Sequence, residues 1–253
     1  LKYCFSHSIR CYMSPKISDI ILLGTDRIHL FDTPLLMCRN QGLSMEQRAF
    51  KRVLDIIISG LGIIVSSPIM LIIAIAVKAY DGGPVFYLQD RLTYKGKEFR
   101  IRKFRSMCVD SEKNGARLAS KHDSRITPVG HILRNLHLDE LPQLFNVFMG
   151  DMSLVGPRPE RDVIMQEYEK EIPEFHYRLK VKAGLTGYAQ VYGKYNTTPY
   201  DKLKLDLFYI ENYSFLLDIK LLFMTVKIFF QKEVSEGVDD DQKNALKDSQ
   251  EEK

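Results

Sequence analysis

The sequence predicts an α+β protein that is mostly helical, with a re-entrant membrane helix hairpin, a small cytosolic α/β part and interfacial amphipathic helices. Three observations carry this prediction: a long apolar segment at 53–77, short extended segments between turns at 82–102, and apolar residues at helical spacing from 136 onward. An apolar content of 45% and a charged content of 27% are typical of a globular chain, and 253 residues can enclose a sizeable core.

Charge and cysteine usage narrow the functional classes. The net charge is only +4, but residues 78–134 hold 13 Lys and Arg against 6 Asp and Glu. Such a basic middle favours an anionic partner, whether phosphates, lipid headgroups or nucleic acid. The four cysteines lack paired spacing and the histidines form no metal motif, which argues against a disulfide framework or a zinc site and favours a reducing location.

The first 46 residues hold two short apolar runs, 20–23 and 28–31, around a polar turn. These runs are too small for a stable domain by themselves, so we expect the end of an α/β unit or a linker. We expect no signal peptide, because residues 1–20 lack a continuous apolar core. Whether the chain is a fragment or uses an alternative start is left open, since it begins with leucine.

The apolar segment 53–77 contains one charge, Asp55. As a straight helix it would extend roughly 37 Å at about 1.5 Å per residue, so a single-pass helix is the simplest interpretation. We favour a re-entrant hairpin, because Ser67 and Pro68 lie near the middle and basic residues flank both ends. Serine hydroxyls can satisfy the backbone groups that such a kink leaves free. Arg52, three residues before Asp55, is expected to pair with it.

Short elements separated by turns follow the apolar segment. Residues 85–88 and 99–102 are expected to be strands around a glycine turn. Residues 154–159 predict a rigid turn, because two prolines bracket one arginine. The glycines of 184–187 predict another loop.

Helical spacing dominates the second half of the chain. Residues 136–148 are expected to form one helix, and residues 164–180 a helix interrupted by Pro173. Residues 203–230 are expected to be helical with a break near 212–214, and their second half fits an interfacial amphipathic helix as well as a core helix. Residues 233–253 are rich in acids and poor in apolar side chains, which predicts a disordered tail.

Adjacent acids, Asp139 and Glu140, are the candidate catalytic residues. Two neighbouring acids are more often a solvated pair, but here Leu138 and Leu141 flank them and Pro142 follows, as in the first turn of a helix. One carboxylate can attack phosphorus while its neighbour holds a divalent cation. Cations that could neutralise a diphosphate, or alternatively face lipid, are Arg91, Lys103, Arg105, Arg134 and Arg158. Strand alternation places Lys103 and Arg105 on one face.

Long motifs in a fixed order resemble one family. They are KR-x-x-D (51–55), SP (67–68), GPVFY-x-Q-x-R (83–91), KFRSM (103–107), LDELPQLFNV (138–147), GDMSLVGPRPE (150–160) and GLTGYAQV (184–191). The chain resembles the bacterial sugar transferases, monotopic polyprenyl-phosphate hexose-1-phosphate transferases, over about residues 47–232. Residues 1–46 resemble the end of a nucleotide-binding-like domain that precedes this catalytic domain in longer members.

The resemblance implies a reaction, a cofactor and a location. A UDP-sugar is expected to give its sugar-1-phosphate to undecaprenyl phosphate, with release of UMP, in the first membrane step of exopolysaccharide, capsule or O-antigen assembly. Asp139 is expected to be the nucleophile that forms a phosphosugar-enzyme and Glu140 the ligand of Mg²⁺. The implied location is the cytosolic face of the bacterial inner membrane, where lipids contact a re-entrant helix broken at Ser67 and Pro68. The sequence leaves a homodimer open.

Substrate contacts are also implied by the resemblance. Lys103, Arg134 and Arg158 match basic residues around the phosphates. The loop containing Gln190 is expected to contact the nucleotide or the sugar. This chain has Ala183, Tyr188 and Lys194 where the family usually has proline, tryptophan and arginine, and Thr93 where glycine is usual. These differences concern the identity of the substrate rather than the reaction class.

Three other functions fit parts of the pattern. A conventional glycosyltransferase would move the sugar without its phosphate and release a nucleoside diphosphate. A membrane scaffold without activity would bind nucleotide sugars or assembly proteins. Asp139→Asn separates that case, because intact turnover would show that the nucleophile assignment is wrong. Nucleic-acid binding explains the basic stretch but not the apolar segment, so we expect no nucleic-acid partner.

Overall fold

The computed structural model describes residues 2–30, 33–37, 42–109, 123, 125–194 and 197–229. The chain divides into two compact units, Leu1–Asn40 and Gln41–Lys253. The first unit contains α1 (Lys2–Ser6), α2 (Ile17–Leu23) and an antiparallel pair of strands, β1 (Asp26–Leu30) and β2 (Thr33–Met37). The predicted acidic tail, 233–253, lies outside the described residues.

Helix α3 (Met45–Asp81) contains the whole apolar segment in 37 residues. A capping box formed with Ser44 begins the helix. Gly82 ends it with a φ of 69°, a left-handed conformation that glycine adopts without strain. Helix α3 is long and apolar enough to cross a membrane, and only 17% of its most apolar 18-residue window is buried. The core helix of a soluble protein would be mostly buried, which α3 is not.

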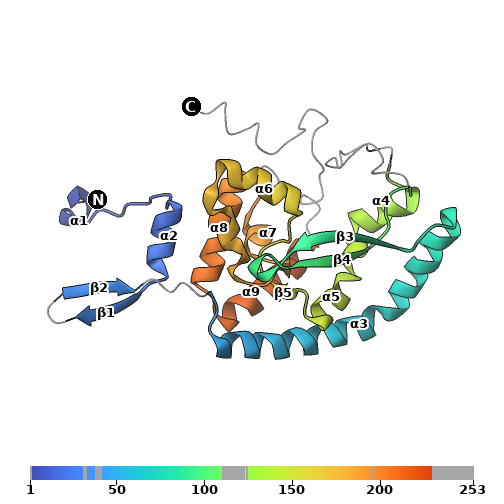
Figure 1. Cartoon of the computed structure of the whole chain (residues 1–253), viewed down its shortest axis with the longest axis horizontal. Coiled ribbons are helices and arrows are strands. Elements are labelled where there is room, and N and C mark those ends of the chain that lie inside the picture. The colour runs from blue at the N-terminus through green and yellow to red at the C-terminus, as the bar shows by residue number, and fades with distance from the viewer. Residues whose placement is uncertain are drawn as a thin grey trace. The chain divides into compact units, whose positions relative to one another are not determined.

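The direction of α3 changes in its second half (Figure 1). Pro68 has no N–H, so the carbonyl of Ile64 lacks its usual helical partner. The hydroxyl of Ser67 donates to that carbonyl at 2.8 Å, which confirms the compensating role expected for a serine here. The helix is nevertheless continuous, so the expected break at Ser67 and Pro68 is a bend. Re-entry into the membrane remains a prediction.

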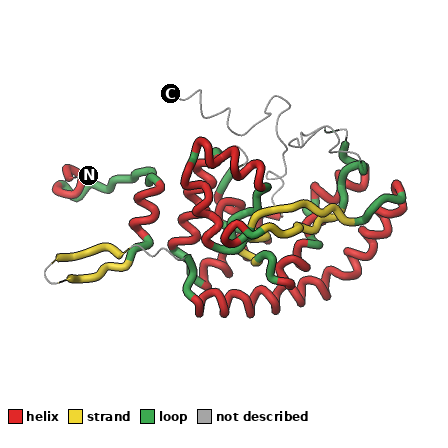
Figure 2. The backbone as a smooth tube through the Cα atoms, viewed as in Figure 1, coloured by secondary structure: helices red, strands yellow, loops and turns green. Residues whose placement is uncertain are grey.

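Two small sheets belong to the second unit (Figure 2). The predicted strands are confirmed and longer than expected: β3 (Phe86–Leu92) pairs antiparallel with β4 (Glu98–Phe104) across a short 3-10 turn, η1 (Tyr94–Gly96). The predicted loop at 184–187 is wrong, because β6 (Gly184–Thr186) pairs in parallel with β5 (Ser153–Val155). A Cβ on Gly184 would lie 2.1 Å from the amide nitrogen of Gly156, so glycine here permits close approach of two backbones.

Short helices complete the second unit. They are α4 (Pro128–Asn135), η2 (Leu138–Glu140), α5 (Gln143–Met149), α6 (Asp162–Glu171), η3 (Pro173–Lys180), α7 (Tyr188–Tyr192), α8 (Pro199–Glu211) and α9 (Phe215–Phe229). Both predicted interruptions, at Pro173 and near 212–214, are confirmed. The single helix predicted at 136–148 is wrong: His137 has a left-handed φ of 52°, residues 138–140 form the 3-10 turn η2, and α5 begins only at Gln143.

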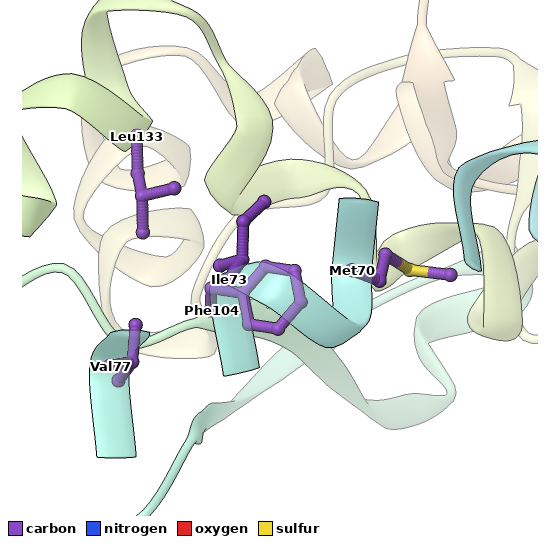
Figure 3. Close-up of a cluster of buried hydrophobic side chains, with 5 residues drawn as sticks. All are labelled: Met70, Ile73, Val77, Phe104 and Leu133. Atoms are coloured by element: carbon purple, nitrogen blue, oxygen red, sulfur yellow. The ribbon is translucent and has the colours of Figure 1, made fainter. Parts of the chain in front are cut away.

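A buried cluster joins the second half of α3 to the β-hairpin and α4. Its members are Met70, Ile73, Val77, Phe104 and Leu133, drawn in Figure 3. Leu138 and Leu141 pack against this cluster from the η2 turn. The first half of α3 packs against α5, where a Cβ on Gly60 or Gly62 would contact the side chains of Phe148 and Leu144. The long helix therefore supports the turn that carries the predicted catalytic acids.

Candidate active site

Asp139 and Glu140 lie on η2, between α4 and α5. The leucines on either side of them, Leu138 and Leu141, are held against the buried cluster. The expected placement in the first turn of a helix is only partly right, since the acids occupy a separate 3-10 turn and Pro142 caps α5 after them. Packing of the flanking leucines therefore fixes the backbone that carries both carboxylates.

Two cations hold the carboxylate of Glu140. Lys103 Nζ lies 2.7 Å from Oε1, and the Arg158 guanidinium lies 2.9 Å from the same oxygen. Burial alone would raise the pKa of Glu140, but Arg158 and Lys103 hold that pKa well below its usual range. Glu140 is therefore ionised throughout the physiological pH range.

Asp139 has a different environment from its neighbour. No described residue donates a hydrogen bond to its carboxylate, although the side chain is partly buried. Burial raises the pKa of Asp139, the charge of Glu140 raises it further, and Lys103 and Arg134 oppose the shift. A carboxylate without hydrogen-bond donors keeps its lone pairs available for a bond to phosphorus.

Arg134 lies in the last turn of α4, near enough to Asp139 for their charges to interact. Its Nε donates to the hydroxyl of Ser106 at 2.9 Å. Burial lowers the pKa of Arg134, and the charge of Asp139 partly opposes that shift. The backbone of α4 also lies against that of Ser106. A Cβ on Gly130 would lie 1.9 Å from the carbonyl oxygen of Ser106, so only glycine permits this contact. Three of the predicted phosphate-binding cations, Lys103, Arg134 and Arg158, are thus gathered around Asp139 and Glu140.

The other predicted substrate-binding residues contact different partners. Arg105 forms an ion pair with Asp81 at the end of α3. The guanidinium of Arg91 donates to the carbonyl of Pro159 at 3.2 Å and to Gln89 at 2.6 Å. Both polar atoms of the Gln190 side chain are buried on α7 without a hydrogen-bond partner among the described residues. Phosphate or sugar binding by Arg91, Arg105 and Gln190 remains a prediction.

Oxygen atoms at this site suit the magnesium ion implied by the resemblance. Both cations that hold Glu140 bind Oε1, which leaves its Oε2 and the Asp139 carboxylate without a recorded donor. The described residues contain no group of three or more potential metal ligands. Magnesium commonly binds one or two carboxylates together with substrate phosphates and water, so the free oxygen of Glu140 fits such an ion.

Charged residues at the start of α3 have roles that the sequence analysis missed. The expected Arg52–Asp55 ion pair is wrong: Arg52 donates to the carbonyls of Val147 and Phe148, each at 2.7 Å, at the C-terminal end of α5. Asp55 instead accepts a hydrogen bond from the Leu154 amide at 2.9 Å. A charge in an apolar helix signals the need for a partner, but those partners lie about a hundred residues away in sequence.

Lys51 continues this set of contacts between α3 and the C-terminal helices. Its ammonium lies 2.5 Å from the carboxylate of Asp218 on α9 and donates to the Tyr209 hydroxyl on α8 at 3.2 Å. The Tyr209 hydroxyl donates in turn to Asp218 at 2.8 Å. These side chains are buried, so the motif KR-x-x-D joins α3 to the rest of the unit.

A carboxylate without donors, beside an ion-paired carboxylate and three cations, is typical of enzymes that act on phosphate groups. The family model described as bacterial sugar transferase matches residues 46–232. The chain belongs to this family.

Relatives with assigned activities share much of the sequence. The chain is 44% identical over 180 residues, or 70% of its length, to a UDP-N-acetylgalactosamine-undecaprenyl-phosphate N-acetylgalactosaminephosphotransferase of Aeromonas hydrophila. It is 43% identical over 208 residues, or 80% of its length, to a UDP-glucose:undecaprenyl-phosphate glucose-1-phosphate transferase of Klebsiella pneumoniae. An undecaprenyl-phosphate galactose phosphotransferase of Salmonella typhimurium is 36% identical over 87% of the chain. The matched regions cover only 43%, 43% and 49% of these relatives.

Proposed function

We propose that the chain transfers a sugar-1-phosphate from a UDP-sugar to undecaprenyl phosphate and releases UMP. The observation that carries the proposal is the Asp139 carboxylate, which has no hydrogen-bond donor among the described residues and whose charge interacts with those of Lys103 and Arg134. Relatives named for this type of transfer support it. Because their sugars differ, the proposal leaves the sugar open.

Asp139 acts as the nucleophile in the first of two displacements at one phosphorus and as the leaving group in the second. In the first, its carboxylate oxygen forms a bond to the phosphorus that carries the sugar, and the bond from that phosphorus to UMP breaks. In the second, an oxygen of undecaprenyl phosphate bonds to the same phosphorus and the bond to Asp139 breaks. Lys103, Arg134 and Arg158 balance the charge of the phosphates during both steps.

Glu140 is the residue that would hold a magnesium ion together with the substrate phosphates. The ion would supply positive charge that polarises the phosphate oxygens. Glu140 is suited to this role because its low pKa keeps it ionised and Lys103 and Arg158 fix its orientation.

The site functions at the cytosolic face of the inner membrane. Large apolar side chains more than half exposed along α3 support membrane contact: Val53, Ile57, Leu61, Ile64, Val65, Leu71, Ile72 and Ile75. Along α9, a second exposed stripe alternates apolar and basic residues: Leu216, Lys220, Phe223 and Lys227. An apolar stripe with lysines is suited to the interface between acyl chains and headgroups, where α9 would lie parallel to the membrane.

Nucleotide release tests this proposal. The full chain is incubated with UDP-N-acetylgalactosamine, UDP-glucose or UDP-galactose, together with undecaprenyl phosphate and Mg²⁺. UMP release with at least one donor is expected. Release of UDP would indicate a conventional glycosyltransferase, and no release with any donor would contradict the proposal. Without acceptor, a burst of UMP is expected, together with a mass increase on Asp139 of one phosphate carrying the sugar of the donor used.

A further inference from the structure

The turn from Pro157 to Glu160 carries Arg158, the exposed partner of Glu140. Every backbone carbonyl in this turn accepts a hydrogen bond. The donors are, in order along the turn, the Gly184 amide at 2.9 Å, the Arg178 guanidinium at 3.0 Å, the Arg91 guanidinium at 3.2 Å and the Leu92 amide at 3.0 Å. Two of the four donors are side chains from distant elements, so the shape of the turn depends on where those arginines lie.

Arg178 on η3 is itself fixed by buried groups. Its guanidinium lies 2.7 Å from the carboxylate of Asp206 on α8, and these side chains are only 5% and 1% exposed. Its other terminal nitrogen lies 3.6 Å from Glu160, and the guanidinium stacks over the Phe175 ring at 4.9 Å. An ion pair with so little solvent contact is oriented by its partners and not by water.

We propose that Arg178 and Asp206 are positioning residues that hold Arg158 in place against Glu140. This inference rests on the proposed function, in which Arg158 balances the charge of the substrate phosphates beside Asp139. Neither Arg178 nor Asp206 has a recorded contact with the two acids, so both act through the backbone of Arg158. The Arg158 side chain is half exposed and would otherwise sample many rotamers, so a fixed backbone favours its contact with Glu140.

Asp206 is ionised at neutral pH, as this arrangement requires. Burial raises its pKa to about 6, and the negative charge of Glu160 adds to the shift. Arg178 and Lys202 oppose it. The carboxylate is therefore charged above about pH 6, where its attraction to Arg178 is strongest.

Hydrogen exchange tests the positioning role without any need for turnover. The amides of Leu92 and Gly184 donate to the turn, so their exchange reports its order. Arg178→Lys keeps the charge but loses the planar guanidinium, and Asp206→Asn keeps the shape of the carboxylate. Both variants of the full chain are expected to exchange these amides about tenfold faster. The matched control is Asp218→Asn, because Asp218 is also a buried helical acid with one cation, Lys51, and has no recorded contact with the turn.

A kinetic cycle then separates positioning from general destabilisation. Arg178→Lys is expected to lower kcat about tenfold in the wild-type background but less than about threefold in an Arg158→Lys background, because both changes disturb one interaction. Asp218→Asn is expected to have equal effects in the two backgrounds.

The outcomes distinguish this inference from the proposed function. Equal effects of Arg178→Lys in both backgrounds, or unchanged exchange at Leu92 and Gly184, would overturn the positioning role. Equal acceleration of that exchange in Asp218→Asn would overturn it as well. If the wild-type chain releases no UMP from any donor, the proposed function fails, and the exchange experiment alone decides whether Arg178 and Asp206 hold the turn.

Discussion

The η2 turn and the start of α3 each carry a compact group of charges, but their surroundings differ. At the start of α3, Lys51 contacts Asp218 and Tyr209, and Asp55 accepts a hydrogen bond from the Leu154 amide. On η2, Glu140 is ion-paired while Asp139 receives no hydrogen bond from a described residue. The charges at the start of α3 join secondary-structure elements together, whereas those on η2 leave the Asp139 carboxylate available to bind a ligand.

This difference teaches how a structural charge can be told from a reactive one. Sequence spacing did not separate the two groups, because both consist of charges among apolar residues. What separates them is whether each buried charge is satisfied by the protein. An unsatisfied carboxylate is unfavourable for folding, so its presence in a site with several cations indicates a role in binding or chemistry.

The largest expected effect is the loss of turnover in Asp139→Asn. An amide cannot form the acyl-phosphate, so UMP release should fall about a thousandfold or more. The free energy of unfolding should change by no more than about 1 kcal/mol, because no hydrogen bond to Asp139 is lost. UMP release and thermal unfolding measure the two quantities. Asp90→Asn, at an exposed site on β3, serves as the control and should retain activity within about twofold.

Removing a charge at the start of α3 should lower stability more than it lowers turnover. Lys51→Met leaves Asp218 buried without its cation and should lower the free energy of unfolding by about 3–5 kcal/mol. Combining it with Asp218→Leu should restore much of the loss, because the uncompensated charge is then removed. Thermal unfolding in detergent compares the variants. A double variant less stable than Lys51→Met would show that the buried charges are not the cause.

Glu140→Gln sharpens the comparison within the η2 turn. The amide no longer holds Lys103 and Arg158 by charge, so turnover should fall about a hundredfold. Below the pKa of Asp139, the wild-type kcat/KM should fall with pH, because the protonated acid is not a nucleophile. The charge of Glu140 raises that pKa, so its removal should move the acidic limb to lower pH. A pH profile of kcat/KM measures the shift, and movement to higher pH would contradict this assignment.

Local sequence patterns predicted most helices and the β-hairpin and marked the acid pair with five candidate cations, of which the family resemblance selected three. They did not predict the parallel strands, because Gly184 marks a close backbone approach whose partner lies near residue 156. Nor did they predict the partners of Lys51, Arg52 or Arg178, since a charge signals the need for a counterion but not its position. Contacts between residues far apart in sequence depend on packing, which spacing alone does not encode.

The smallest effect concerns the bend in α3, where Ser67 is the residue tested and the neighbouring Ser66 is its control. Ser67→Ala removes the donor to the Ile64 carbonyl, which has no backbone partner because residue 68 is proline. This loss should lower the free energy of unfolding by about 1 kcal/mol. Ser66→Ala should lower it by less than about 0.5 kcal/mol, because the Gly62 carbonyl keeps the backbone N–H of residue 66 as a donor. Thermal unfolding in lipid nanodiscs compares the two variants. Equal losses of unfolding free energy would show that the Ser67 hydroxyl does not compensate for the missing N–H of Pro68.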